Sequence, residues 1–176
     1  MSNIGIKDFI LNLNRNKNGI YFWVINLGEL GLESSAFKDG EKMPRKYGYT
    51  EENISPPLSI KSVPEGTESL ALIMDDPDAK PVAGKIWTHW LIWGIDPGIG
   101  EIPEDWSSTA TEGKNDYGEK GYGGPNPPDK AHTYEFKLYA LDSEINLKEN
   151  SKKKDVEKAL KGHIIDKTKL RGVFEP

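Results

Sequence analysis

Residues 86–95 read Ile-Trp-Thr-His-Trp-Leu-Ile-Trp-Gly-Ile. This short run, rich in Trp and Ile, predicts a β-strand. Alternate residues of a strand share a face. One face is expected to carry Trp87, His89, Leu91 and Trp93, and the other Thr88, Trp90 and Ile92. Because both faces are largely apolar, the strand is expected to be covered on both sides.

Three further strands are expected. Ser69–Met74 is an apolar run that ends in Asp75-Asp76-Pro77, and it predicts a central strand. A second strand over Thr133–Leu141 places on one face Tyr134, Phe136, Leu138 and Ala140. A short final strand is expected over Ile164–Phe174. Together with 18 glycines and 12 prolines, which favour turns, these runs predict a β-rich fold.

The clearest helix is expected over Ser151–Lys161. Ser151 is a plausible N-cap, and Gly162 fits the C′ position. A narrow apolar stripe is formed by Val156, Ala159 and Leu160. His163 then lies at the helix end, where stabilisation of a cation by the helix dipole explains it without a functional role.

Length, charge and cysteine content exclude several classes of protein. A chain of 176 residues predicts one domain with a sizeable core. A net charge of −5 argues against nucleic-acid binding, which needs a basic surface. The absence of cysteine excludes disulfides, thiol nucleophiles and cysteine zinc sites, and it fits a cytoplasmic protein.

Residues 1–28 differ from the rest of the chain. Asparagine recurs there among Ile, Leu and Phe, so the segment could be an added helix, an added strand or an artefact of an upstream start. We interpret it as an N-terminal extension of unknown role before a domain over residues 29–176. Its apolar run at residues 20–25 is far shorter than the ~20 residues that span a membrane, so no integral membrane segment is expected.

Two motifs bring a histidine close to a turn. Asp76-Pro77-Asp78 precedes His89, and Gly121–Pro128 precedes His132-Thr133-Tyr134. Glycine-rich turns can expose N–H groups to an anion, and a histidine beside a carboxylate can be a tuned donor. Two strands and two turns could therefore build one polar pocket that suits an anion.

Each motif alone has a simpler explanation. The Asp-Pro-Asp turn could hold two solvated acids, His89 could be a hydrogen-bonded core histidine, and His132 could lie at an exposed strand edge. A metal site built from Asp76, Asp78 and His89 is conceivable, but nothing in the spacing is diagnostic. The chain has no G-x-S-x-G elbow and no phosphate loop, and no cofactor or metal is expected.

The ordered motifs closely resemble the phosphatidylethanolamine-binding protein family, also called the Raf kinase inhibitor protein family, and most strongly its bacterial and archaeal branch. The resemblance covers roughly residues 30–174 and is carried by Ser35–Gly40, Ile54–Leu58, Asp76–Ala79, Trp87–Trp90, Gly121–Pro128, His132–Tyr134 and Leu138–Asp142.

The resemblance implies a mostly β fold, with a large antiparallel sheet packed on a smaller one and a helix near the C-terminus. It also implies a small surface pocket for phosphate- or carboxylate-bearing ligands, including phospholipid head groups. Carried over by motif position, the pocket residues are Asp76, Trp87, His89, Gly124, Pro125, His132 and Tyr134.

Family members act mainly as binders and regulators of kinases or proteases, so a non-enzymatic role is expected, and prokaryotic members often look like homodimers. Serine protease inhibition through the long loop region 98–129 is the alternative. An enzyme using a His–Asp pair is the weakest interpretation, because no nucleophile or cofactor motif is evident.

Three positions depart from the family pattern. Lys80 stands where members usually carry proline, with Pro81 one residue later, so the pocket rim is expected to differ in shape and to gain a positive charge. Thr133 replaces an arginine between His132 and Tyr134, so partner contacts through that guanidinium are in doubt. Asn126 stands where prokaryotic relatives often have cysteine.

Overall fold

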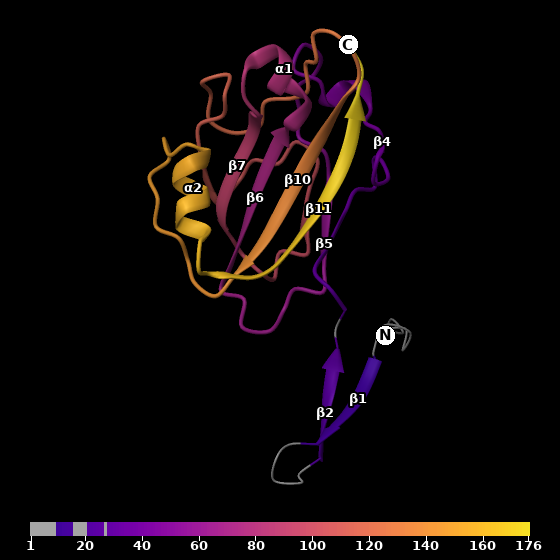
Figure 1. Ribbon diagram of the computed structural model, residues 1–176, viewed down its shortest axis with the longest axis vertical. Helices are drawn as coiled ribbons and strands as arrows, with labels where there is room; N and C mark the ends of the chain where they lie inside the picture. The colour runs from indigo at the N-terminus through magenta and orange to yellow at the C-terminus, as the bar shows by residue number, and fades with distance from the viewer. Residues whose placement is uncertain (1–9, 16–20, 27) are drawn as a thin grey trace.

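The computed structural model describes residues 10–15, 21–26 and 28–176 (Figure 1). Two sheets of unequal size form the body of the molecule, which confirms the mostly β fold. The large sheet has the order β4 (Glu41–Lys42), β11 (Ile164–Phe174), β10 (His132–Leu141), β6 (Ser69–Asp76), β7 (Trp87–Ile95) and β9 (Thr111–Glu112). The small sheet has the order β3 (Gly31–Glu33), β5 (Leu58–Lys61) and β8 (Glu101–Ile102). All pairings are antiparallel except the two-residue pairing of β4 with β11.

Two apolar cores lie on opposite faces of the large sheet. The alternating residues predicted on one face of β10 are all fully buried, in the core that the two sheets share. The other face is covered by helix α2 (Lys153–Leu160), whose Val156 and Leu160 pack with Leu91 and Trp93 of β7 (Figure 1). All eight residues of β6 are buried, as the prediction of a central strand required.

The expected alternation along β7 is broken by a β-bulge at His89. Thr88 pairs with Asp75 and Trp90 pairs with Met74, so His89 is the extra residue between two consecutive residues of β6. A bulge lets two successive residues oppose one. Leu91 and Trp93 face α2 as a pair, but the His89 ring packs against Tyr134 of the other core. The prediction that His89 shares the face of Leu91 and Trp93 is therefore wrong.

Helix α2 is shorter than the sequence predicts. Its N-cap is Lys152 rather than Ser151, because the Asp155 carboxylate accepts a hydrogen bond from the Lys152 N–H at 3.0 Å. Gly162 follows the helix with φ of 91°, as expected of a C′ glycine. The His163 Nδ1 lies 2.9 Å from Asp142 Oδ1, so a carboxylate, and not the helix dipole alone, accounts for that histidine.

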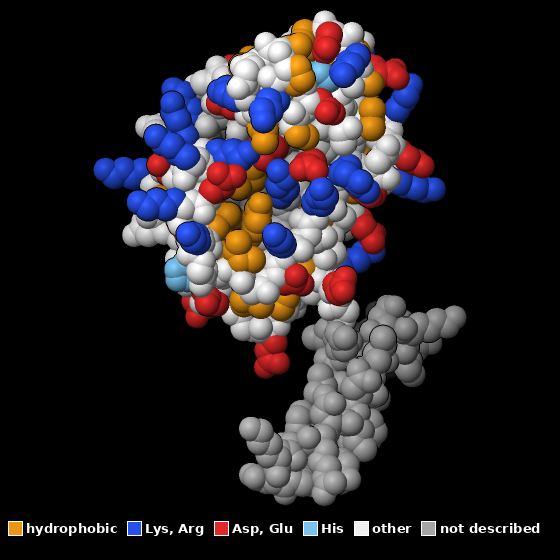
Figure 2. Space-filling model, in the orientation of Figure 1, with side chains coloured by type: hydrophobic (Ala, Val, Ile, Leu, Met, Phe, Trp, Pro, Cys, Tyr) orange, Lys and Arg blue, Asp and Glu red, His pale blue; other side chains and the backbone are white. Residues whose placement is uncertain are grey.

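The outer face of β10 and β11 carries many charges of both signs (Figure 2). A buried carboxylate lies beneath them: Asp75 Oδ2 accepts from Lys137 Nζ at 3.0 Å and from Lys153 Nζ of α2 at 2.8 Å. β11 is an edge strand along most of its length, since β4 pairs only with Gly172 and Val173. Lysines on such an edge discourage pairing with other chains.

Within residues 1–28, β1 (Ile10–Arg15) and β2 (Tyr21–Asn26) form an antiparallel pair of their own. Of the three interpretations of this segment, the strands exclude the added helix over the described residues; residues 1–9, 16–20 and 27 lie outside them. The domain boundary at residue 29 stays a prediction. Among the helices of the described chain, none is long and apolar enough to cross a membrane.

Candidate functional site

The sheet topology explains why two motifs far apart in sequence meet. β6 lies between β7 and β10 and is antiparallel to both, so the end of β6 adjoins the starts of β7 and β10. Asp76 ends β6, Trp87 begins β7 and His132 begins β10. All three therefore lie at the same end of the sheet, beneath the short helices η3 (Pro77–Ala79) and α1 (Lys80–Ala83) (Figure 1).

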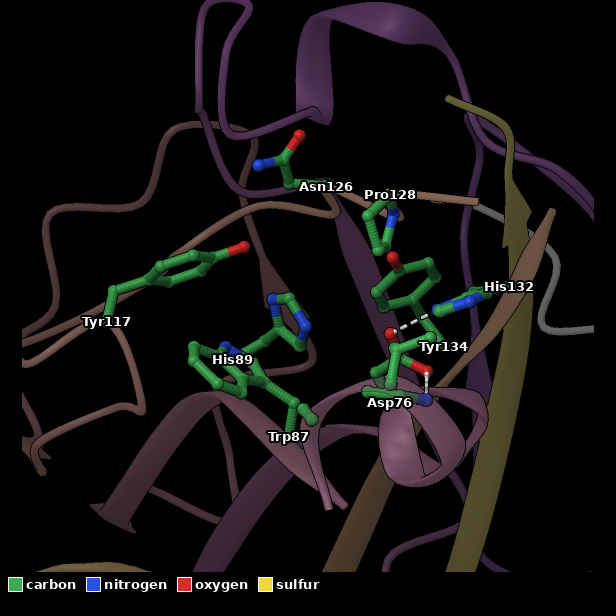
Figure 3. A pocket seen from close by; sticks show the side chains of 11 residues that line it. Asp76, Trp87, His89, Tyr117, Asn126, Pro128, His132 and Tyr134 are labelled. Carbon is green, nitrogen blue, oxygen red and sulfur yellow. Dashed lines mark hydrogen bonds and ion pairs between the residues drawn. The ribbon is translucent and has the colours of Figure 1, made fainter. Parts of the chain in front are cut away.

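A cavity of about 260 Å³ opens at this end of the sheet (Figure 3). Its wall is formed by Asp76, Ala79, Val82, Ala83, Trp87, His89, Tyr117, Asn126, Pro128, His132 and Tyr134. Five of the seven residues that the sequence assigned to a pocket are thus brought together, whereas Gly124 and Pro125 are outside this wall.

His132 is held between two carboxylates. Its Nδ1 lies 2.7 Å from Asp76 Oδ2, and its Nε2 lies 2.9 Å from Asp129 Oδ1. Burial of the ring opposes its charge, but the hydrogen bond and the charge of Asp76, followed by those of Asp129, outweigh burial and raise the pKa of His132 above its ordinary value. The imidazolium form, with both nitrogens donating, satisfies both carboxylates. His132 therefore links Asp76 to Asp129 within the cavity wall, and both of its nitrogens already have a partner.

Asp76 also organises the turn that follows it. Its Oδ1 accepts from the Ala79 N–H at 3.0 Å, which caps η3, and its Oδ2 faces His132. Asp78 is equally committed, because its Oδ2 accepts from the Thr133 N–H at 2.8 Å. In the described part of the chain, no group of three or more His, Asp or Glu side chains is arranged to hold a metal ion. These hydrogen bonds give both oxygens of Asp76 and one oxygen of Asp78 a partner within the protein.

The surroundings of His89 favour its neutral form, whereas those of His132 favour the imidazolium. Its Nδ1 lies 2.6 Å from the Gly123 carbonyl oxygen, and the residue is 2% exposed. Burial lowers the pKa of His89 more than the Gly123 carbonyl and the charge of Asp76 raise it, so the ring is neutral at pH 7. Because a carbonyl can only accept, the proton of the neutral ring is on Nδ1.

Two buried donors in the cavity wall have no partner among the described residues. They are the indole Nε1 of Trp87 and the hydroxyl of Tyr134. Burial and the charge of Asp76 raise the pKa of Tyr134, so its hydroxyl stays protonated and can donate. A buried polar group without a partner is costly, so each of these two donors needs an acceptor from a water molecule or a ligand.

Aromatic rings complete the wall. The Tyr117 ring meets Trp87 and His89 edge-on, at centroid distances of 5.5 and 5.6 Å, and stacks on Tyr49 at 3.9 Å. Its hydroxyl donates to the Gly124 carbonyl at 3.1 Å. Sequence reasoning missed Tyr117 because it lies in a long loop, with no motif to place it.

The glycine-rich segment 121–128 does not present free N–H groups at Gly123 and Gly124. The Gly123 N–H donates to the His89 carbonyl at 2.9 Å, and the Gly124 N–H donates to Asn53 Oδ1 at 2.8 Å. A Cβ on Gly123 would come within 2.6 Å of the Tyr117 ring, and one on Gly124 would overlap the Tyr47 carbonyl oxygen. The expected nest of exposed N–H groups is therefore not formed at these two positions, where glycine instead permits close packing.

The three departures from the family pattern occupy different places. Asn126 lies in the cavity wall and is exposed. Thr133 contributes only its backbone N–H to the turn at Asp78. Lys80 begins α1 and is exposed, next to the rim residues Val82 and Ala83.

The fold and the cavity define a class of protein: two unequal β-sheets with a small polar and aromatic cavity at one end of the larger sheet. A family model described as phosphatidylethanolamine-binding protein matches residues 33–175. The chain therefore belongs to the phosphatidylethanolamine-binding protein family, as its motifs predicted.

Relatives in archaea and bacteria support this assignment. A UPF0098 protein of Methanothermobacter thermautotrophicus is 42% identical over 155 residues, which span 82% of this chain and 98% of that protein. A putative phosphatidylethanolamine-binding protein homolog of Chlamydia trachomatis has a similar structure, with a TM-score of 0.80 and 37% identity over 84% of this chain and 98% of that one. The E. coli protein YbcL gives a TM-score of 0.79 with 33% identity, over 85% of this chain and 99% of its own.

Proposed function

We propose that this chain is a non-enzymatic binding and regulatory protein whose cavity takes small ligands bearing a phosphate or carboxylate group, phospholipid head groups among them. The observation that carries the proposal is the pair of buried donors without partners, Trp87 Nε1 and the Tyr134 hydroxyl, in one cavity wall. An oxyanion supplies the acceptors that both donors lack. A cavity of about 260 Å³ suits such a group with a short substituent.

The state of the His132–Asp76 pair favours a structural role over acid–base catalysis by that pair. A general base needs a nitrogen or oxygen within reach of a substrate proton. Both nitrogens of His132 and both oxygens of Asp76 are used within the protein. The His–Asp pair is therefore better suited to hold the cavity wall in place than to transfer protons.

An NMR titration of the imidazole signals tests the proposal. O-phosphoethanolamine, inorganic phosphate and acetate are added separately to the full chain. We expect the His89 signals to shift strongly and the His132 signals to shift less, because both nitrogens of His132 already have partners. His163, exposed and paired with Asp142, serves as an internal control. A cavity that leaves the His89 signals unchanged with all three compounds would refute the proposal.

A matched pair of variants tests whether the indole Nε1 of Trp87 donates to the anion. Trp87→Phe removes the unpartnered Nε1 and keeps most of the ring, so anion affinity should fall by about tenfold or more. Trp90→Phe removes a donor that already pairs with Glu112 Oε1 at 2.9 Å, so it should leave affinity unchanged. A larger response to O-phosphoethanolamine than to phosphate would identify a head-group site; equal responses would identify a general phosphate site.

The partner and location assignments need separate experiments. Serine protease inhibition through residues 98–129, a kinase partner, a homodimer and a cytoplasmic location all stay predictions. Stoichiometric inhibition of a chymotrypsin-like protease would support the first of these, and lack of inhibition across a protease panel would exclude it.

A further inference from the structure

The loop that packs on His89 fixes its tautomer. Nδ1 donates to the Gly123 carbonyl at 2.6 Å, and the Gly123 N–H donates back to the His89 carbonyl at 2.9 Å. Among the described residues, the hydrogen bonds of this ring use Nδ1 only. Nε2 is therefore the ring nitrogen left to meet a ligand in the cavity that His89 lines (Figure 3).

A neutral His89 does not match an oxyanion at that contact. With the proton on Nδ1, Nε2 presents a lone pair, and the oxyanion presents lone pairs as well. The Trp87 indole and the protonated Tyr134 hydroxyl donate whatever the protonation state of His89. A second proton on His89 turns this repulsive contact into a charge-assisted hydrogen bond, which is among the stronger kinds.

We propose that the cavity takes up an oxyanion and one proton together, with the proton held on Nε2 of His89, so that binding strengthens as the solution becomes more acidic. This inference rests on the proposed anion-binding function and specifies how that site is regulated. Ligand and proton must favour each other to the same extent, because their coupling is reciprocal. For one linked proton, affinity changes by at most about tenfold per pH unit.

The groups around His89 act on its charge in opposite directions. Burial opposes the imidazolium form of His89 and lowers its pKa. Carboxylates on β6 favour the imidazolium. The titratable groups that surround the ring are Asp75 and Asp76 from β6, His132 and Tyr134 from β10, and Tyr117 and Asp129 from the loop region. A bound anion adds the negative charge that makes the second proton favourable.

Sulfate is the probe that distinguishes proton uptake by the protein from proton uptake by the ligand. It keeps both negative charges across about pH 5.5–8.5, the range in which a histidine changes charge, so any proton taken up is bound by the chain. Calorimetric titration in two buffers of different ionisation enthalpy gives the number of protons per sulfate. We expect close to one proton at the alkaline end and an affinity that falls up to about tenfold per pH unit there.

Two variants assign the proton. His89→Gln supplies an amide that does not titrate, and we expect the pH dependence of sulfate affinity to become flat. His163→Gln removes an exposed histidine on Asp142 and should leave the proton uptake unchanged. The ¹⁵N shift of Nε2 in the unmodified protein, with and without sulfate, reports the same proton without any substitution.

The outcomes separate the two proposals. Sulfate binding with no proton uptake and constant affinity would overturn this inference and leave the anion site intact. Uptake that persists in His89→Gln would also overturn it. If sulfate, phosphate and O-phosphoethanolamine all fail to bind at any pH, the proposed function fails first, and this inference fails with it.

Discussion

Tyr134→Phe should make the ligand-free protein more stable and its anion binding weaker. The Tyr134 side chain is fully buried, and its hydroxyl has no partner among the described residues. The ring packs edge-on against His89 at a centroid distance of 5.0 Å, a contact that phenylalanine retains. The substitution removes one hydroxyl that lies near Asp76 and the Asn126 backbone without a well-aligned hydrogen bond to either.

The two effects have opposite signs because the hydroxyl lacks a partner in the ligand-free protein but donates to the anion in the complex. A buried polar group without a partner costs about 1–3 kcal/mol, so its loss should raise the free energy of unfolding by about 1 kcal/mol when the cavity is empty. A hydrogen bond to a charged group contributes about 1.5–3 kcal/mol, so its loss should weaken anion binding by about 10- to 150-fold.

Urea unfolding of dialysed protein and calorimetric titration with phosphate measure the two quantities. Tyr122→Phe is the matched control, because its hydroxyl donates to the Tyr47 carbonyl at 2.9 Å and lies outside the cavity wall. That variant should lose about 1 kcal/mol of stability and keep its affinity. If Tyr134→Phe instead lowers stability, or leaves phosphate affinity unchanged, the hydroxyl is not the ligand donor we infer.

Three further predictions concern the surrounding structure. Replacing both Lys137 and Lys153 by Met should cost more in urea unfolding than the two single changes together, because either lysine alone still pairs with buried Asp75, and the loss of both leaves its charge uncompensated at about 3–5 kcal/mol. Because the pKa of His132 is raised, its stabilisation is complete below the ordinary value of 6.5 and is lost as the pH rises through the raised pKa, so His132→Gln should flatten the pH dependence of thermal unfolding above neutrality. Gly124→Ala should destabilise by about 1–3 kcal/mol in urea, because its Cβ would overlap the Tyr47 carbonyl oxygen.

Each of these has a control on the surface. Lys61→Met breaks an exposed pair with Glu33 and should cost no more than about 1 kcal/mol. His163→Gln should leave the alkaline limb of the pH profile in place. Gly98→Ala should be nearly neutral, since its nearest side-chain neighbour is the exposed Asp96 carboxylate, which can move. Additive lysine effects, an unchanged pH profile in His132→Gln or a stable Gly124→Ala would each contradict the corresponding contact.

The four longest strands, β6, β7, β10 and β11, were predicted from the sequence, whereas the short strands β3, β4, β5, β8 and β9 were not. The run 164–174 forms β11 with the predicted bounds, and the buried alternation of β10 follows its sequence. The bulge at His89 could not be predicted, because it depends on how β7 pairs with β6 and not on β7 alone. The helix N-cap was misplaced by one residue, because the Asp155 carboxylate accepts from the Lys152 N–H and so makes Lys152 the N-cap.

Site residues at the ends of the long strands could be predicted from the sequence, and the site residue Tyr117, which lies in a loop, could not. Asp76, Trp87 and His132 meet because strand order brings their positions together. Tyr117 enters the wall through a loop whose path is set by long-range contacts, including its own bond to the Gly124 carbonyl. The sequence analysis correctly singled out the glycine-rich segment but gave the wrong reason for it. Gly123 and Gly124 are required for close packing and do not expose their N–H groups.

The two histidines of the cavity show how partners assign different roles to one residue type. Both lie near the start of a strand at the same end of one sheet, and both are almost fully buried. His132 has a carboxylate at each nitrogen, which favours a lasting positive charge that holds the wall together. His89 has one carbonyl and several aromatic rings, which favour a neutral ring with one nitrogen unused. If the proposed proton uptake is correct, His132 holds the shape of the wall through its two carboxylates and His89 alone changes charge when an anion binds, because only His89 has a ring nitrogen without a partner among the described residues.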